Sequence, residues 1–146
     1  MSVLVDTNVL VYAALADAPW HVKARAFVDS RRRAGSLCVT WSVLYEFLSV
    51  VTHPRVMARP ITPDAAHGFV FELLAGGGVD VLLETENHAG FLRQVLSLVP
   101  PSRGRLYHDV HIASLMLEHA VDTIATADGH FRLFPFLKVI DPTAPR

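Results

Sequence analysis

Short apolar runs alternate along this chain of 146 residues with longer segments whose apolar positions recur at helical spacing. The apolar runs predict strands at residues 3–5, 37–41, 79–83, 122–126 and 137–140. The segments between them predict helices from about residue 8 to 15 and over 20–34, 42–53, 63–75, 87–99 and 107–120. Strands that alternate with helices build a largely parallel sheet with helices on both faces, so the pattern predicts an α/β fold.

Residue types at the helix ends support these boundaries. Thr62 and Pro63 are types preferred at the N-cap and the first helical position. In the second predicted helix, Val22, Ala26 and Phe27 recur at the spacing of one helix face, and the basic residues at its end suit a helix C-terminus.

Composition places the chain among single-domain globular proteins, with residues 1–146 as one domain. Apolar residues make up 51% and charged residues 18%, which argues against disorder. The single cysteine, Cys38, excludes an internal disulfide, fits a reducing compartment and is expected to be buried. No apolar run reaches the length of a membrane span, and Asp6 interrupts the apolar amino-terminal stretch, so we expect a cytoplasmic protein without membrane contact. The net charge of −1 does not by itself indicate a nucleic-acid partner.

Four acidic residues lie close enough to predicted strand ends to share one edge of the sheet. Asp6 directly follows the first strand, and Glu46 lies in the helix after the second. Asp109 lies in the first turn of the last predicted helix, and Asp128 follows the fourth strand after one intervening residue. Parallel α/β sheets bind ligands beyond the carboxyl ends of their strands, so these carboxylates are expected to converge. A divalent cation such as Mg²⁺ or Mn²⁺ would relieve their repulsion, as in metal sites that cleave phosphodiesters.

Each acid taken alone also has a structural interpretation. Asp6 suits an N-cap, Asp109 suits the positive end of a helix dipole, and Asp128 suits a turn. Glu46 has apolar neighbours on both sides, and its carboxylate is hard to explain there without a partner. The four together indicate a site more strongly than any one of them.

Four segments give the chain a resemblance to the PIN-domain ribonucleases, and among them to the VapC toxins of VapBC toxin–antitoxin pairs. "VLVDTNVLVYA" resembles the family's amino-terminal D-x-N motif, and "VLYEFLSVVTHPRV" resembles the segment that carries its glutamate. "HDVHIASLMLEHAVDTIATADGHF" resembles the later D and (T/S)-x-D-x-x-F motifs, and "RLFPFLKVIDP" resembles the tail. The resemblance runs nearly end to end, and four motifs in this order are more specific than any single one.

The resemblance implies a PIN-domain α/β/α sandwich with a mainly parallel central sheet. The family's metal-site positions match Asp6, Glu46, Asp109 and Asp128. Asn8 matches the residue that orients the first aspartate, and Thr126 matches the hydroxyl residue beside the last. The implied activity is endonucleolytic RNA cleavage by metal-activated water, dependent on Mg²⁺ or Mn²⁺ and without a covalent intermediate. The implied partners are RNA, a second copy in a homodimer, and a VapB-type antitoxin whose tail covers the active site.

The chain departs from the family's pattern near these motifs. His130 stands where some relatives carry another acid, Val110 where a small residue is common, and His111 where an apolar residue is common. These departures leave the number of metal ions open but remove none of the four acids.

The histidines near the motifs are His108, His111, His119 and His130. No HExxH or Cys/His pattern supports a zinc site, so surface packing or contact with RNA are the simpler interpretations. Arg103 and Arg105, in the loop before the last predicted helix, are the best candidates for contact with RNA phosphates, with a solvated loop as the alternative. Trp20 and Trp41 suit a core or dimer face better than stacking on a base.

Two other classes of function are weighed against the nuclease. A PIN-like binding module without catalysis predicts the loss of an acid, yet all four are present. An aspartyl-phosphate phosphohydrolase needs D-x-D after its first strand, where this chain has Asn8 in the second acidic position. The apolar helix segment "HGFVFELL" predicts an interface with a second copy or with an antitoxin.

Overall fold

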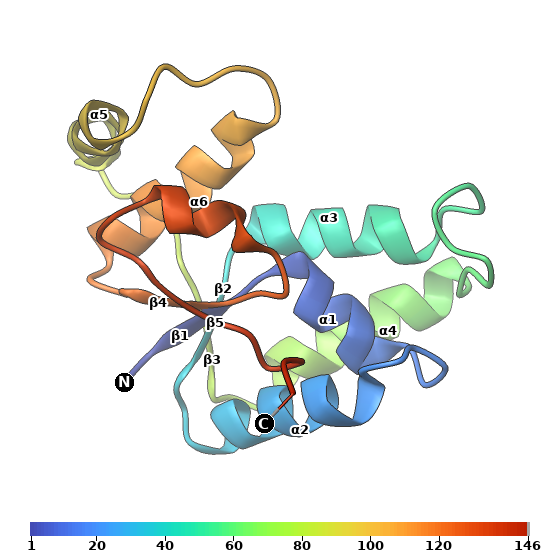
Figure 1. Cartoon of the computed structure of the whole chain (residues 1–146). Coiled ribbons are helices and arrows are strands. Elements are labelled where there is room, and N and C mark those ends of the chain that lie inside the picture. Colours follow the sequence, from blue (N-terminus) through green and yellow to red (C-terminus); the bar gives the residue numbers. More distant parts are fainter. Residues whose placement is uncertain (146) are drawn as a thin grey trace.

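A sheet of five parallel strands forms the centre of the computed structural model, which describes residues 1–145 (Figure 1). The strands are β1 (Val3–Val5), β2 (Leu37–Val39), β3 (Val79–Val81), β4 (Thr123–Ala125) and β5 (Lys138–Ile140). The helices are α1 (Thr7–Ala14), α2 (His21–Arg33), α3 (Trp41–Val51), α4 (Pro63–Ala75), α5 (His88–Leu98), α6 (Leu106–Glu118) and the 3₁₀ helix η1 (Gly129–Leu133). Every predicted strand and helix is present, with ends shifted by at most a few residues.

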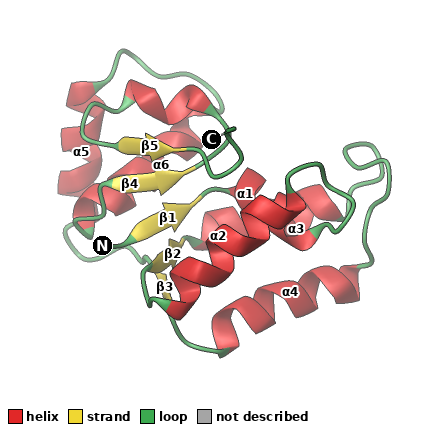
Figure 2. Ribbon diagram, turned by 60° about the horizontal axis from the view of Figure 1, so that its bottom comes forward, coloured by secondary structure: helices red, strands yellow, loops and turns green. Residues whose placement is uncertain are grey.

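The strand order β3-β2-β1-β4-β5 places β1 at the centre, between β2 and β4. Helices α1 to α4 lie on one face of the sheet, and α5 and α6 lie on the other (Figure 2). The predicted α/β/α sandwich is therefore confirmed. The chain moves outward from β1 through β2 to β3 and then returns past β1 to β4, so its direction switches between β1 and β4. Such a switch point leaves a crevice beyond the strand ends.

Three local features differ from the sequence pattern. Thr40 is the N-cap of α3, because its Oγ1 accepts a hydrogen bond from Val43 N at 3.1 Å, and β2 therefore ends before it. Val22 is 78% exposed and Ala26 is exposed too, so α2 turns Ala24 and Val28 to the core instead. The sequence pattern predicts a turn at Asp128 and no helix after it, whereas the structure has the 3₁₀ helix η1 there.

Side chains of β1, β2 and β4 are fully buried and form the middle of the core. Helix residues close it from both faces, with Phe47 and Phe134 among the largest of them. Cys38 is buried as expected, and burial raises the pKa of its thiol, so it acts as a packing residue. Within residues 1–145, no helix combines the length and the apolar character needed to cross a bilayer.

Candidate active site

Asp6 lies at the switch point, where β1 ends and α1 begins. Its backbone N–H donates to the carbonyl oxygen of Ala125 at 2.9 Å, which extends the pairing of β1 with β4. Its side-chain Oδ1 accepts a hydrogen bond from Thr7 N at 2.8 Å and so caps α1. Helix capping and a place in the crevice, which were alternatives in the sequence, therefore coincide in this residue.

Asn8 and Thr126 hold the other oxygen of Asp6 in a closed hydrogen-bond network. Thr126 donates its hydroxyl hydrogen to Asp6 Oδ2 at 2.9 Å. The same hydroxyl accepts hydrogen bonds from Asn8 Nδ2 and from the Asp128 backbone N–H, both at 3.0 Å. Asn8 Nδ2 also donates to Asp6 Oδ2 at 3.4 Å, and Asn8 Oδ1 accepts from Ala127 N at 3.0 Å. A hydroxyl has one hydrogen and two lone pairs, so Thr126 is saturated and serves to position Asp6.

The four predicted acids line one cleft of about 1150 Å³ at this edge of the sheet. Asp109 reaches it from the first turn of α6. Glu46 reaches it from α3, and its Oε2 accepts a hydrogen bond from Thr7 Oγ1 at 3.0 Å. Leu44 and Phe47 turn into the core while Glu46 stays exposed, so helical periodicity accounts for the apolar neighbours that made this glutamate conspicuous.

Two of these acids have raised pKa values. Burial is the main cause for Asp6, whose pKa rises from 3.8 to about 6; the carboxylates of Glu46 and Asp109 add to the effect, and hydrogen bonds oppose it. Burial also raises the pKa of Asp109, where Asp128 and Glu46 add to the effect and two histidines oppose it. The cleft is therefore both acidic and partly desolvated, which favours uptake of a cation.

The donor set of the cleft fits a hard divalent cation. Within residues 1–145, no basic side chain forms an ion pair with Asp6, Glu46 or Asp109, so these three carboxylates have no directly bonded cationic partner in the protein. In this part of the chain, no three of the four acids bring their oxygens within 4.8 Å of one another. An ion in the cleft would therefore contact at most two carboxylates directly without side-chain movement. Mg²⁺ commonly binds one or two carboxylates and retains several waters, which matches this arrangement.

Asp128 differs from the other three acids because a basic side chain, that of His130, lies within ion-pair distance of its carboxylate. Its Oδ1 accepts a hydrogen bond from His130 N at 3.0 Å and caps η1. Its Oδ2 lies 3.0 Å from His130 Nδ1. The turn that the sequence suggested at Asp128 is thus a capped 3₁₀ helix, and a protonated His130 would offset charge at this end of the cleft.

Comparison with known proteins assigns the chain to a family. The profile of the PIN domain matches residues 3–137. The chain belongs to the PIN-domain family. A curated relative, Ribonuclease VapC48 of Mycobacterium tuberculosis, is 32% identical over 143 residues, which cover 97% of this chain and 98% of the relative. The resemblance to VapC-type PIN-domain ribonucleases is confirmed.

Solved structures of VapBC and VapC proteins share the fold at low sequence identity. VapBC2 from Rickettsia felis, crystallised on a DNA fragment from its promoter, matches with a TM-score of 0.69 and 15% identity, covering 97% of this chain and 98% of that one. VapC20 of Mycobacterium tuberculosis, described as a sarcin-ricin loop cleaving toxin, matches with a TM-score of 0.66 and 18% identity, covering 90% and 93%. At these identities the likeness establishes a common fold.

Residues that the sequence did not single out complete the cleft of this PIN domain. Thr7 lies between the two polar residues of the D-x-N motif, and that position is the signal that identifies it. Tyr12 and Tyr45 add aromatic walls. Tyr45 is 69% exposed, and its ring lies 6.4 Å from that of Trp41. Trp41 and Trp20 are both exposed, so the expectation that they close the core is wrong, and a dimer face stays a prediction.

The arginines and histidines near the motifs divide between the cleft and the outside. Arg105 lines the cleft, whereas Arg103, two residues earlier, is exposed and is not part of its lining. His108 and His130 also line the cleft. His111 and His119 instead bind the segment after β3: His111 Nε2 lies 2.6 Å from a glutamate oxygen, and His119 Nε2 lies 2.7 Å from a backbone carbonyl oxygen. The departure from the family pattern at His111 therefore lies outside the acidic site.

Proposed function

We propose that the protein is a Mg²⁺- or Mn²⁺-dependent endoribonuclease that acts as the toxin of a VapBC-type pair. The observation that carries this proposal is a single cleft at the switch point of a PIN fold that gathers Asp6, Glu46, Asp109 and Asp128. The names of the relatives, Ribonuclease VapC48 among them, support RNA as the substrate.

Each residue of the cleft has a role in the proposed reaction. Asp6 and Asp109 would hold the ion, and Asp128 would complete the acidic wall. When bound, Mg²⁺ would supply water activation and stabilisation of charge on the phosphate. Glu46, oriented by the hydroxyl of Thr7, is the exposed acid placed to accept a proton from a water molecule in the cleft.

Cleavage of total cellular RNA by the purified protein tests the proposal. We expect discrete fragments with Mg²⁺ or Mn²⁺, none with EDTA, and none from the Asp109→Asn variant with either metal. Metal binding detected by a melting shift, but without cleavage of any RNA, would favour the binding module. Hydrolysis of a phosphomonoester in place of RNA would favour the phosphohydrolase.

Arg105→Ala is expected to weaken RNA binding more than Arg103→Ala, because only Arg105 lines the cleft. The logarithm of the RNA-binding constant falls linearly with the logarithm of the salt concentration. Loss of one phosphate contact should make this dependence shallower by about 0.7 for single-stranded RNA. Binding is measured by fluorescence anisotropy at several salt concentrations, with Asp109→Asn as the background so that RNA stays intact. Equal losses in both variants would show that the loop contributes only diffuse charge and that neither arginine is a specific contact.

A VapB-type antitoxin and a second copy of the chain are the proposed protein partners. A solved structure with the same fold is a VapBC complex, which supports an antitoxin. On the apolar segment of α4, Phe71 is 68% exposed, which supports an interface there. Light scattering of the isolated protein tests the homodimer, and a monomer at all concentrations would contradict it.

A further inference from the structure

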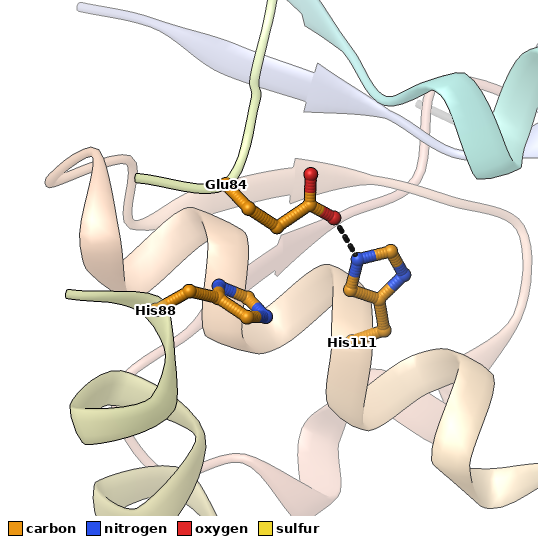
Figure 3. Close-up of side chains that lie close together, drawn as sticks. All are labelled: Glu84, His88 and His111. Atoms are coloured by element: carbon orange, nitrogen blue, oxygen red, sulfur yellow. Dashed lines mark hydrogen bonds and ion pairs between the residues drawn. The ribbon is translucent and has the colours of Figure 1, made fainter. Parts of the chain in front are cut away.

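A second group of metal-ligating side chains lies outside the acidic cleft, where the segment after β3 meets α6 (Figure 3). Glu84, His88 and His111 each turn a ligand atom toward the other two, and these atoms all lie within 4.8 Å of one another. Within residues 1–145, no other three histidine, cysteine or acidic side chains are this close. None of the three lines the acidic cleft, so the group is separate from the proposed nuclease site.

His88 is oriented in the manner of a metal ligand by Glu118. Its Nδ1 lies 2.6 Å from Glu118 Oε2, and the Glu118 side chain is only 1% exposed. Thr85 also donates to Glu118 Oε1 from its backbone N–H and from its hydroxyl, which fixes the carboxylate behind His88. Because a carboxylate accepts hydrogen bonds, His88 donates from Nδ1, and its Nε2 keeps the lone pair. A carboxylate behind a histidine is the usual support of a metal-bound imidazole.

Glu84 and His111 form the adjustable half of the group. Glu84 Oε1 lies 2.6 Å from His111 Nε2, and the two side chains are 49% and 37% exposed. Ligand atoms of a tetrahedral Zn²⁺ lie about 3.3 Å apart, given bonds of about 2.0–2.1 Å. Zn²⁺ binding would displace the proton of the hydrogen bond between His111 and Glu84, so these two ligand atoms, which lie 2.6 Å apart, would separate to that spacing. Exposed side chains can do this by changing rotamers, without movement of the backbone.

We propose that Glu84, His88 and His111 form a binding site for Zn²⁺ or a similar borderline transition metal, with water in the fourth position. Two imidazoles and a carboxylate favour Zn²⁺, Co²⁺ or Ni²⁺, whereas the all-oxygen cleft favours Mg²⁺ or Mn²⁺. The ion joins the segment after β3 and the first residue of α5 to α6, the helix whose first turn carries Asp109. Zn²⁺ therefore stabilises the α5–α6 side of the protein.

Zn²⁺ binding to untagged, chelator-treated full-length protein tests the proposal by calorimetry and thermal melts. We expect one Zn²⁺ per chain with a dissociation constant in the micromolar range or below. When the free Zn²⁺ concentration is about 100 times the dissociation constant, Zn²⁺ should raise the Tm of the protein by about 5–10 °C.

His111→Gln should weaken Zn²⁺ binding at least about tenfold, since an exposed ligand is lost without disturbing the fold. His67→Gln, at an exposed histidine of α4, is the control and should bind Zn²⁺ like wild type.

The variant Glu118→Gln distinguishes a metal site at Glu84, His88 and His111 from a group of side chains that only form ion pairs with one another. Glu118 contacts no ion in the proposed site, yet its loss as an acceptor should weaken Zn²⁺ binding about 10- to 100-fold. Absence of Zn²⁺ binding would overturn the proposal, and so would binding that His111→Gln retains but Asp109→Asn loses, because the ion would then lie in the acidic cleft. Neither result bears on RNA cleavage, which the nuclease experiment measures with Mg²⁺ or Mn²⁺.

Discussion

Asp6→Asn is expected to reduce Mg²⁺-dependent RNA cleavage by at least about 100-fold, because it removes a proposed ligand at the point where charge on the phosphate is stabilised. The same change is expected to leave the metal-free fold at least as stable as wild type. A residue that serves the fold would show the opposite, so activity and stability are measured on the same preparation.

The raised pKa of Asp6 gives the sign of the stability effect. The folded protein keeps this proton up to about pH 6, whereas the unfolded chain releases it near pH 3.8. Because the folded state binds more protons in between, the free energy of unfolding falls as pH rises from about 4 to 6, and the loss is complete above that range. Two pKa units correspond to about 3 kcal/mol. Both oxygens of Asp6 accept hydrogen bonds, and asparagine replaces one of them by an NH₂ group that cannot accept, which offsets about 1–2 kcal/mol of the gain. We therefore expect Asp6→Asn in EDTA at pH 7.5 to raise Tm by a few degrees.

Thermal melts in EDTA at pH 4 and pH 7.5 measure this effect, and the gain should disappear at pH 4. Asp17→Asn, at an exposed aspartate in the loop after α1, is the matched control and should change neither cleavage nor Tm. A Tm several degrees below wild type for Asp6→Asn at pH 7.5 would mean that the carboxylate stabilises the fold, and the metal-site assignment would be wrong.

Thr126→Val is expected to have the second large effect, on stability and on the pH dependence of cleavage together. Valine keeps the shape of threonine but removes a hydroxyl that makes three hydrogen bonds at a residue that is 1% exposed. Leaving their partners unsatisfied should destabilise the protein by about 2–3 kcal/mol. The hydrogen bond from Thr126 lowers the pKa of Asp6, so its loss should raise that pKa and shift the acidic midpoint of the pH–rate profile upward.

Thr126→Ser is the control for this prediction because it retains the hydroxyl. It should restore the wild-type pH midpoint even if the lost methyl group costs some stability. Stability is measured by urea unfolding in EDTA, and the midpoint by cleavage rates in Mg²⁺ across the pH range. Equal activity loss in both variants, with an unchanged midpoint, would show that Thr126 acts by packing and not by positioning Asp6.

The sheet and the shared edge of the acids were predictable because they depend on neighbours in the sequence. Each strand is a short apolar run between helical segments, and this alternation leads to parallel strands. Asp6 directly follows β1 and Asp128 closely follows β4, so parallel strands bring both to one edge of the sheet. Cys38 is buried for the same local reason, since it lies inside an apolar strand.

The contacts that give each side chain its role depend on how distant segments pack. His111 follows Asp109 by two residues, about 200° around α6, so it leaves the cleft and meets Glu84 instead. Helical periodicity separates Asp109 from His111, but it does not specify where α5 and α6 dock. The docking decides that Asp109 faces the cleft and that His111 faces Glu84. The same reason separates Arg105, which lines the cleft, from Arg103, which does not.

The sequence by itself determined the succession of strands and helices along the chain and the residues that follow the strands. Both depend on local patterns of apolar and polar positions. Only the tertiary structure decided that Thr126 links Asp6 to Asn8 across 120 and 118 positions of sequence. It also decided that Glu84, His88 and His111 meet at all. These contacts require the pairing of β1 with β4 and the packing of α5 against α6, which are set by the burial of the whole core and not by any one segment.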